Sequence, residues 1–173
     1  MSDATDRDAR PALAPVIALA CVADLPGLAE MMSGSELLVR YRVTTDGALH
    51  SLSAALEAGD LLLVSRDVEV TGMAWLTFAP RMLDGAAYVR LLLVAEGARG
   101  SGTGSALLAE AESRARQQAN HVYLLATTDN TGARRFYERH GYRHVGDLPG
   151  LVWPDLDEAL YYKTLRAPAE RLR

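Results

Sequence analysis

A glycine-rich passage near the middle of the chain constrains the fold more than any other feature. It reads Arg99-Gly100-Ser101-Gly102-Thr103-Gly104-Ser105, follows a dense apolar run that ends at Val94, and leads directly into an amphipathic segment. Glycines let backbone N–H groups approach a ligand, and the first turn of a helix offers unpaired donors and a partial positive charge. The passage therefore predicts a strand, a tight turn and a helix that together form an anion-binding site.

Two common phosphate-binding motifs do not fit this passage. A P-loop requires Lys and then Ser or Thr directly after its last glycine, and no Lys stands here. The dinucleotide fingerprint requires a further glycine at a position where this chain has Leu107. The spacing that does occur is Arg-x-x-Gly-x-Gly, formed by Arg99, Gly102 and Gly104.

Length and composition predict one soluble globular domain. The chain has 173 residues, of which 49% are hydrophobic and 23% charged, and its formal net charge is -4. That balance gives no reason to expect nucleic acid as a partner. Residues 99–143 nevertheless carry four acidic and seven basic side chains. This basic segment indicates a local anion site, although the same arginines could simply cover a solvated helix face.

The sequence offers no targeting, membrane or metal-binding signal. No run reaches the roughly 18 apolar residues that a membrane span needs. Pro11 and Pro15 interrupt the N-terminal apolar stretch, which argues against a signal peptide. We therefore expect a cytoplasmic protein with no membrane partner and no metal site. The single cysteine, Cys21, cannot form an internal disulfide and is expected to be a buried packing residue.

Hydrophobic periodicity and turn residues predict an α+β fold with a mixed sheet. Strands are expected at about 16–20, 61–65, 68–78, 86–94, 121–127, 142–147 and 158–165, and helices at about 25–32, 46–58, 103–119 and 131–140. Asp24 is expected to cap the first helix and Gly59 to end the second. Residues 14–166 should form the single domain, with tails at 1–13 and 167–173.

Two blocks of sequence together resemble the GCN5-related N-acetyltransferase (GNAT) superfamily. The glycine passage matches the superfamily's R/Q-x-x-G-x-G/A loop, although Glu96 and Gly97 depart from the usual lead-in. Residues 130–142, NTGARRFYERHGY, are similar to its N-x-x-A-x-x-F/L-Y-E-x-x-G-F/Y block and follow at the spacing the superfamily uses. The resemblance spans about residues 16–165. It implies a GNAT-like acyl-CoA N-acyltransferase fold, with a central mixed β-sheet flanked by helices on both faces.

The resemblance also implies a reaction and the residues that bind its co-substrate. Acetyl would pass from acetyl-CoA directly to a primary amine of a small molecule or peptide, without an acyl-enzyme. The glycine loop would hold the pyrophosphate, and the main chain of the preceding strand would pair with the pantetheine arm. The cofactor-binding residues implied in this way are Leu92, Leu93, Val94, Arg99, Gly100, Ser101, Gly102, Thr103, Gly104, Ser105, Asn130, Ala133 and Phe136.

Tyr137 is the general acid that the resemblance implies. A phenol of pKa roughly 10 can protonate a departing thiolate without being ionised at rest. Each residue of this block also has a purely structural alternative. Tyr137 and Phe136 could be core residues, and Asn130 could cap the helix that follows it.

The sequence does not identify a general base for the acceptor amine. Arg90 and Leu91 stand on the strand where related enzymes often carry acids, so a base is expected elsewhere, from Asp84, Glu36 or a chain of waters. An acceptor amine of low pKa would need no base. His140 and His144 have suitable rings but are expected to be surface residues.

The acceptor pocket is expected, by resemblance, at the loop of residues 33–45 that joins the first two helices. Arg40, Tyr41, Arg42 and Glu36 in this loop could recognise an acceptor or be ordinary loop residues. Trp153 lies in an apolar loop at 148–154 and could line the pocket or a homodimer interface. The resemblance favours a homodimer.

Two functions other than catalysis remain open from the sequence. The missing strand acid favours a non-catalytic module that binds or senses acyl-CoA. A nucleotide-phosphate binder is the third hypothesis.

Overall fold

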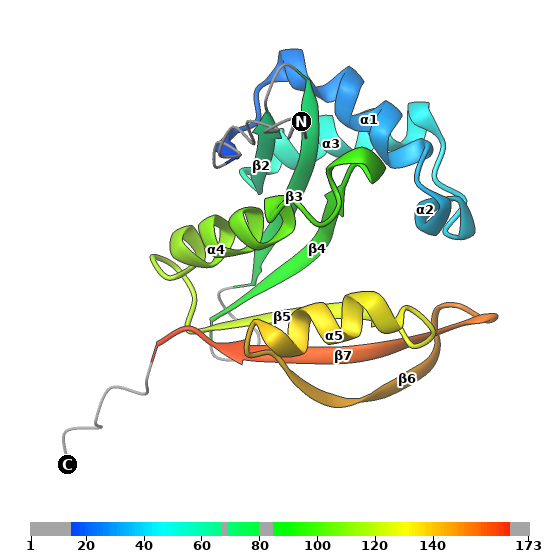
Figure 1. The fold of residues 1–173 in the computed structure, drawn as a ribbon, viewed down its shortest axis with the longest axis vertical. Helices are drawn as coiled ribbons and strands as arrows, with labels where there is room; N and C mark the ends of the chain where they lie inside the picture. Colours follow the sequence, from blue (N-terminus) through cyan, green and yellow to red (C-terminus); the bar gives the residue numbers. More distant parts are fainter. Residues whose placement is uncertain (1–14, 67–68, 80–84, 167–173) are drawn as a thin grey trace, which may run out of the picture.

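A seven-stranded β-sheet forms the centre of the computed structural model, which describes residues 15–66, 69–79 and 85–166 (Figure 1). The strand order is β1-β2-β3-β4-β5-β7-β6. The strands are β1 Val16–Leu19, β2 Leu61–Arg66, β3 Val70–Ala79, β4 Ala86–Val94, β5 His121–Thr127, β6 Arg143–Trp153 and β7 Leu156–Thr164. Neighbouring strands are antiparallel except β4 and β5, which are parallel. The mixed sheet is confirmed; the predicted tails and Asp84 lie outside the described residues.

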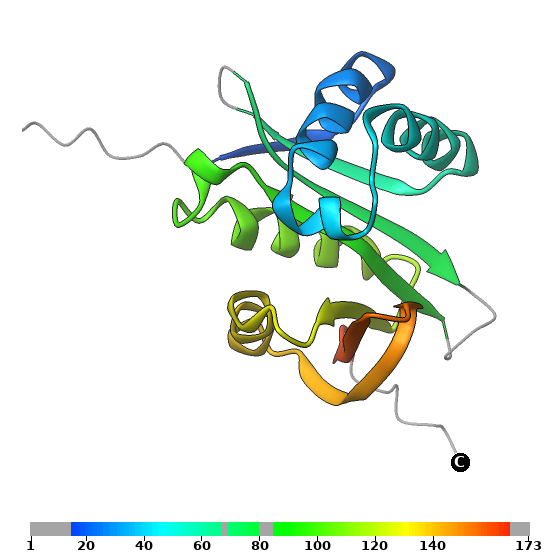
Figure 2. The same cartoon turned by 90° about the vertical axis from the view of Figure 1, so that its right-hand side faces the viewer.

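Helices cover both faces of this sheet, as predicted (Figure 2). One face carries α1 Leu25–Ser33, α2 Glu36–Arg40 and α3 Thr45–Ala58, and the other carries α4 Thr103–Ala115 and α5 Thr131–Arg139. Short 3-10 turns, η1 Val22–Asp24 and η2 Glu96–Ala98, precede α1 and α4. Among the described residues, no helix combines the length and the apolar character that crossing a membrane requires.

Strand alternation divides the apolar side chains between two cores. In β2, Leu63 packs towards α4, whereas Leu62 and Val64 pack towards α1 and α3. Successive side chains of a strand point to opposite faces, so a strand covered on both faces reads as a continuous apolar run. That is why the runs at 61–65 and 86–94 have no polar face.

Local signals set most helix ends. Thr44 Oγ1 accepts a hydrogen bond from Gly47 N (3.1 Å) at the start of α3, and Gly59 ends that helix with φ 77°. Asn130 Oδ1 accepts from Ala133 N (3.0 Å) at the start of α5. Gly59 was predicted as a cap and Asn130 was named as a possible one, whereas Thr44 was not recognised from the sequence.

Asp24 and Cys21 differ from expectation. The Asp24 side chain does not cap α1; it accepts a hydrogen bond from Cys21 N (2.7 Å) and pairs with Arg66 of β2. Cys21 is exposed, not buried, because β1 ends at Leu19 and the chain turns into η1 at the edge of the sheet.

Three predicted element boundaries were wrong. The helix expected to reach residue 119 ends at Ala115, because the chain turns back towards β5 and buries Ala119. The loop at 33–45 contains the short helix α2. The apolar segment at 148–153 belongs to β6, where pairing with β7 continues as far as Trp153 opposite Leu156.

The two halves of the sheet diverge between β4 and β5. Only four pairs join these strands, from Ala86 opposite His121 to Val89 opposite Leu124. Arg90 then forms a bulge, since Trp75 of β3 pairs with Leu91 while the next β3 residue pairs with Val89. Beyond the bulge the strands separate (Figure 1), so the β5-facing edge of residues 90–94 has no strand partner.

Candidate active site

The glycine loop forms an open cradle of backbone donors at the start of α4. Gly100 and Gly102 have φ values of 80° and 90°, which an L side chain rarely adopts. A Cβ built on either glycine meets nothing within 4 Å, so both face open space. The N–H groups of Gly102, Gly104 and Ser105 bond to no acceptor in the described part of the chain. These donors, added to the helix dipole, suit a phosphate group.

Hydrogen bonds of the Ser101 side chain stabilise the glycine loop internally. Ser101 Oγ donates to Ala98 O (2.7 Å) and lies 2.8 Å from Thr103 Oγ1, while Thr103 itself is buried. The Arg99 side chain is 60% exposed and lies 3.9 Å from Glu96 Oε1. The structure therefore places the backbone of this loop at the predicted anion site and leaves the Arg99 guanidinium in solvent beside it.

A cleft of about 630 Å³ opens where β4 and β5 diverge. Its walls combine three regions: the divergent ends of β4 and β5, the first turns of α5, and the segment from α1 to α3. Of the predicted cofactor residues, Leu92, Asn130 and Ala133 line the cleft. Leu93 and Val94 continue β4 towards the glycine loop, and Leu93 is buried on the α1 and α3 side.

Tyr137 lies in the wall of this cleft. Its side chain is 7% exposed and packs in a T-shaped contact against Tyr142. Burial, and to a lesser degree Tyr88, raise the pKa of Tyr137 above its ordinary value. No hydrogen bond joins its hydroxyl to another of the described residues. Tyr137 is thus protonated at neutral pH, with its donor unused.

Phe136 does not line the cleft. It packs against the core beneath α4, and a Cβ added to Gly104 would lie 3.6 Å from its ring. His140 stacks on Phe136 with ring centroids 4.2 Å apart. Phe136 is therefore a partly buried residue at the edge of the core, beside Gly104 of the glycine loop.

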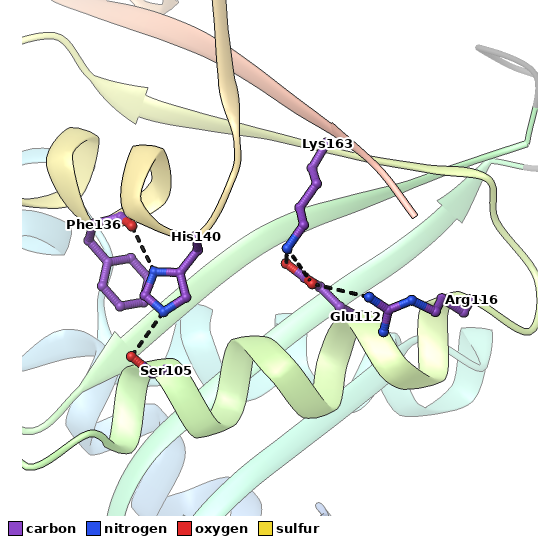
Figure 3. Close-up of polar contacts among 6 residues, drawn as sticks. All are labelled: Ser105, Glu112, Arg116, Phe136, His140 and Lys163. Atoms are coloured by element: carbon purple, nitrogen blue, oxygen red, sulfur yellow. Dashed lines mark hydrogen bonds and ion pairs between the residues drawn. The ribbon is translucent and has the colours of Figure 1, made fainter. Parts of the chain in front are cut away.

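His140 is a bridge between α5 and α4, not a surface residue as expected. Its Nδ1 lies 2.7 Å from Phe136 O and its Nε2 lies 3.0 Å from Ser105 Oγ (Figure 3). The link holds the end of α5 against the first turn of α4. His144, by contrast, is a surface residue and pairs with Asp147 at 2.9 Å.

Glu158 is a candidate functional residue of the cleft that the sequence reasoning missed. It lies on β7 opposite Thr127, the last residue of β5, and is 2% exposed in the wall of the cleft. The Tyr41 hydroxyl donates a hydrogen bond to Glu158 Oε1 and lies 3.1 Å from Thr127 Oγ1. Among the described residues that line the cleft, Glu158 is the one acid.

A signal for Glu158 was present in the sequence. Leu156 and Glu158 face inward while Asp157 between them is exposed. An acid at an inward position of a strand points to a functional site. The strand was predicted to begin at residue 158, so the apolar Leu156 that sets this alternation was left outside it.

Three consecutive residues, Arg40, Tyr41 and Arg42, reach across the cleft to the C-terminal half of the chain. Arg40 Nη1 lies 3.0 Å from Asp129 Oδ2, and the Arg42 guanidinium lies 4.2 Å from the centre of the Trp153 ring. With Tyr41 on Glu158, these contacts form a strap over the end of the cleft that contains Glu158. Trp153 packs under the Arg42 guanidinium and is not itself among the residues that line the cleft.

Glu36 and Arg90 complete the charges near this end. Glu36, a predicted candidate base, is exposed at the start of α2 and does not line the cleft. The Arg90 guanidinium lies 4.6 Å from the centre of the Trp75 ring and does line it. Arg42 and Arg90 have no acidic partner within the described ranges.

Comparison with known proteins agrees with this fold. Residues 35–142 match the family model described as the acetyltransferase (GNAT) family. A curated relative, blasticidin-S acetyltransferase from Streptomyces morookaense, is 44% identical over 78 residues, which span 45% of this chain and 57% of the relative.

Solved structures share the whole fold at low sequence identity. A ribosomal-protein-alanine N-acetyltransferase from Brucella melitensis superposes with a TM-score of 0.73 at 21% identity, covering 86% of this chain and 99% of its own. An N-acetyltransferase from Staphylococcus aureus gives 0.75 at 18%, covering 88% and 99%. The yncA protein of Salmonella typhimurium, solved with its cofactor acetyl-CoA, gives 0.72 at 22%, covering 90% and 96%. Because the family model covers more than half of the chain and the fold agrees throughout, the chain belongs to the GNAT acetyltransferase family.

Proposed function

We propose that this protein is an N-acetyltransferase that transfers acetyl from acetyl-CoA directly to a primary amine. The observation that carries the proposal is one continuous path, from the donor cradle at the start of α4, along the unpaired edge of β4, to Tyr137 and Glu158 in the cleft. The path offers phosphate donors at one end and proton-transferring groups at the other. The curated relative, named for acetylation of blasticidin S, supports the same class of reaction.

The chain's own groups fit acetyl-CoA. The free N–H groups of Gly102, Gly104 and Ser105 would hold the pyrophosphate, with Arg99 beside them. The unpaired main-chain edge of residues 92–94 would pair with the amides of the pantetheine arm, as a strand partner would. Asn130 and Ala133 would contact the same arm from the first turn of α5.

Tyr137 would act as the general acid. Its hydroxyl is protonated, desolvated and free of other partners, so it can donate to the thiolate sulfur as the carbon–sulfur bond breaks. Cys21 lies on η1 at the sheet edge and is not among the residues that line the cleft, which supports direct transfer without an acyl-cysteine.

The remaining expectations are part of the same proposal. Residues 14–166 would form the single catalytic domain, with tails on either side. Acetyl-CoA is an intracellular metabolite, which fits a cytoplasmic protein. A homodimer would fit the β6 edge of the sheet, where Val145, Leu151 and Val152 are exposed. Light scattering on the purified chain tests that assembly.

Tyr137→Phe tests the proposed reaction. We expect kcat to fall about 10²-fold or more, because the general acid is lost. The Kd for acetyl-CoA should stay within about twofold, since the hydroxyl has no role in binding the ground state. Calorimetry gives the Kd, and amine-dependent release of the CoA thiol gives kcat.

Tyr123→Phe is the matched control. Tyr123 lies on β5 outside the cleft and stacks on Tyr162, so its hydroxyl should not matter for either measurement. A wild-type protein that binds acetyl-CoA but releases no thiol with any amine would instead be an acyl-CoA-sensing module. Stabilisation by adenosine triphosphate in preference to acetyl-CoA would favour a nucleotide binder.

A further inference from the structure

The charges inside the cleft are one buried carboxylate and two arginines. Glu158 is buried in the wall, and Arg42 and Arg90 line the same cleft. Each arginine is held over a tryptophan ring, at 4.2 and 4.6 Å from the ring centre, and not over an acid. Glu158 is therefore the one group in the cleft that would stabilise a positively charged part of a ligand, and the two arginines would repel a second positive charge.

No cation among the described residues forms an ion pair with Glu158. Its Oε1 accepts the hydrogen bond from Tyr41, and its Oε2 accepts none from the described residues. The positive charge of Arg40 lowers the pKa of Glu158, but the Arg40 side chain forms its ion pair with Asp129. A buried carboxylate without a cation costs free energy, so such groups are kept where a ligand supplies the charge.

The environment of Glu158 suits a group that takes up a proton. Burial raises the pKa of Glu158, the hydrogen bond from Tyr41 and the charge of Arg40 lower it, and Asp129 raises it. Tyr88, across the cleft on β4, is the other titratable neighbour, and burial raises the pKa of its own phenol. Burial and the bond to Glu158 also raise the pKa of Tyr41 to about 12, so Tyr41 remains a donor at every working pH.

We propose that the acceptor is a primary amine with a single positive charge, and that its ammonium group binds against Glu158 and gives its proton to that carboxylate. Tyr41 is the positioning residue that holds the carboxylate in place. Arg42 and Arg90 disfavour acceptors with a second ammonium group, because that group would lie near them. This inference rests on the proposed acetyl transfer.

The proton balance of the step is complete. One N–H bond of the ammonium breaks and the proton passes to Glu158 Oε2. The nitrogen lone pair bonds to the acetyl carbonyl carbon, the carbon–sulfur bond breaks, and Tyr137 gives its proton to the sulfur. The second proton that nitrogen loses restores the phenol of Tyr137, and Glu158 releases its proton to solvent. An ammonium and a thioester thus become an amide, a thiol and one free proton.

A matched pair of amines tests the class of acceptor. n-Hexylamine and 1,6-diaminohexane have the same carbon chain and differ in the second ammonium group. We expect kcat/KM for n-hexylamine to exceed that for 1,6-diaminohexane by at least about tenfold. Equal values, or a preference for the diamine, would overturn the single-charge assignment.

Three variants test the role of Glu158. Glu158→Gln should lower kcat/KM for n-hexylamine about 10²-fold or more, with the Kd for acetyl-CoA within about twofold. Tyr41→Phe should move the acidic limb of the pH profile upward by about one unit, because the carboxylate loses a hydrogen bond that stabilises its charge. Glu57→Gln, on the exposed face of α3, is the matched control and should change neither quantity.

A measurement without turnover separates this inference from the proposed reaction. In CoA-saturated protein labelled with carbon-13 at glutamate carboxyls, the resonance absent from Glu158→Gln should shift on adding n-hexylammonium chloride and not on adding 1-hexanol. If the resonance shifts but no thiol is released, the proposed acetyltransferase activity is contradicted and the binding of the ammonium group at Glu158 still stands. Thiol release with an unshifted resonance, or with a Glu158→Gln variant of unchanged pH profile, would overturn the inference alone.

Discussion

Glu158 places a carboxylate inside the protein with a tyrosine as its partner and no ion pair to a cation of the described residues. Its pKa is raised by burial, so the folded protein holds the proton more tightly than the unfolded chain does. The stability that this group contributes is therefore fully present below the ordinary pKa of 4.5 and is lost as the pH rises through the folded pKa. At neutral pH, the charge that serves catalysis weakens the fold.

Glu158→Gln should therefore be more stable than the wild type at pH 8. The amide can still accept the hydrogen bond from Tyr41 and carries no charge to desolvate. We expect a gain of roughly 1 kcal/mol, or about 2–4 °C in Tm, that shrinks towards pH 4.5. Thermal unfolding across this pH range, with Glu57→Gln as control, provides the measurement. If the stability gain of Glu158→Gln over the wild type were smaller at pH 8 than at pH 4.5, this account would be contradicted.

At the scale of elements, the start of α4 is positioned by close packing on β3. Gly72 of β3 faces that helix, and a Cβ there would lie 2.9 Å from Leu107 Cδ1, 3.0 Å from Leu93 O and 3.2 Å from Thr103 Cγ2. The glycine thus lets the helix approach the sheet closely enough for its first turn to continue β4. The anion cradle depends on a contact far from it in sequence.

Gly72→Ala should push α4 away from the sheet. Overpacking of this kind typically costs about 1–3 kcal/mol, and the displaced helix start should also weaken acetyl-CoA binding several-fold. Gly27→Ala in α1 is the control, because a Cβ at Gly27 meets nothing within 4 Å. That change should be neutral or add up to roughly 1 kcal/mol through helix propensity. Urea denaturation measures the stability and calorimetry measures the Kd for acetyl-CoA. An unaltered Kd in Gly72→Ala would show that acetyl-CoA binding does not depend on the packing of α4 against Gly72.

At the scale of the whole molecule, few contacts hold the two halves of the sheet together across β4 and β5. Four strand pairs join them, and the strap of Arg40, Tyr41 and Arg42 spans the open side. On the opposite face, buried Glu112 of α4 pairs with Lys163 of β7 at 2.7 Å (Figure 3). The strap thus bridges the halves at the open end of the gap, whereas the Glu112–Lys163 pair lies beside the paired end, where Val122 is opposite both Ala87 and Lys163.

Lys163→Met should destabilise the protein by about 2 kcal/mol, because among the described residues it leaves Arg116, at 3.7 Å, as the one cation near the buried Glu112 carboxylate. Arg116→Met should cost no more than about 0.5 kcal/mol, since the Arg116 side chain is exposed and its contact is long. Chemical denaturation compares the two. Adding Glu112→Gln to Lys163→Met should recover at least half of the loss, and an unrecovered loss would mean that the lysine stem, not its charge, provides the stability.

The sequence by itself determined the parts of this protein whose causes are local. The strands, the caps at Asn130 and Gly59, and the glycine loop follow from periodicity and from backbone conformations that few residues adopt. The block that contains Tyr137 was recognisable for the same reason, since its residues are close neighbours in the chain.

Only the tertiary structure decided which distant residues meet in the cleft. Glu158 and Tyr41 are 117 positions apart, and their contact depends on the order of strands and on the divergence of β4 from β5. Neither follows from local pattern, because strand order is set by packing of the whole sheet against both layers of helices. The acid that the sequence lacked on β4 is therefore supplied, in our proposal, from β7.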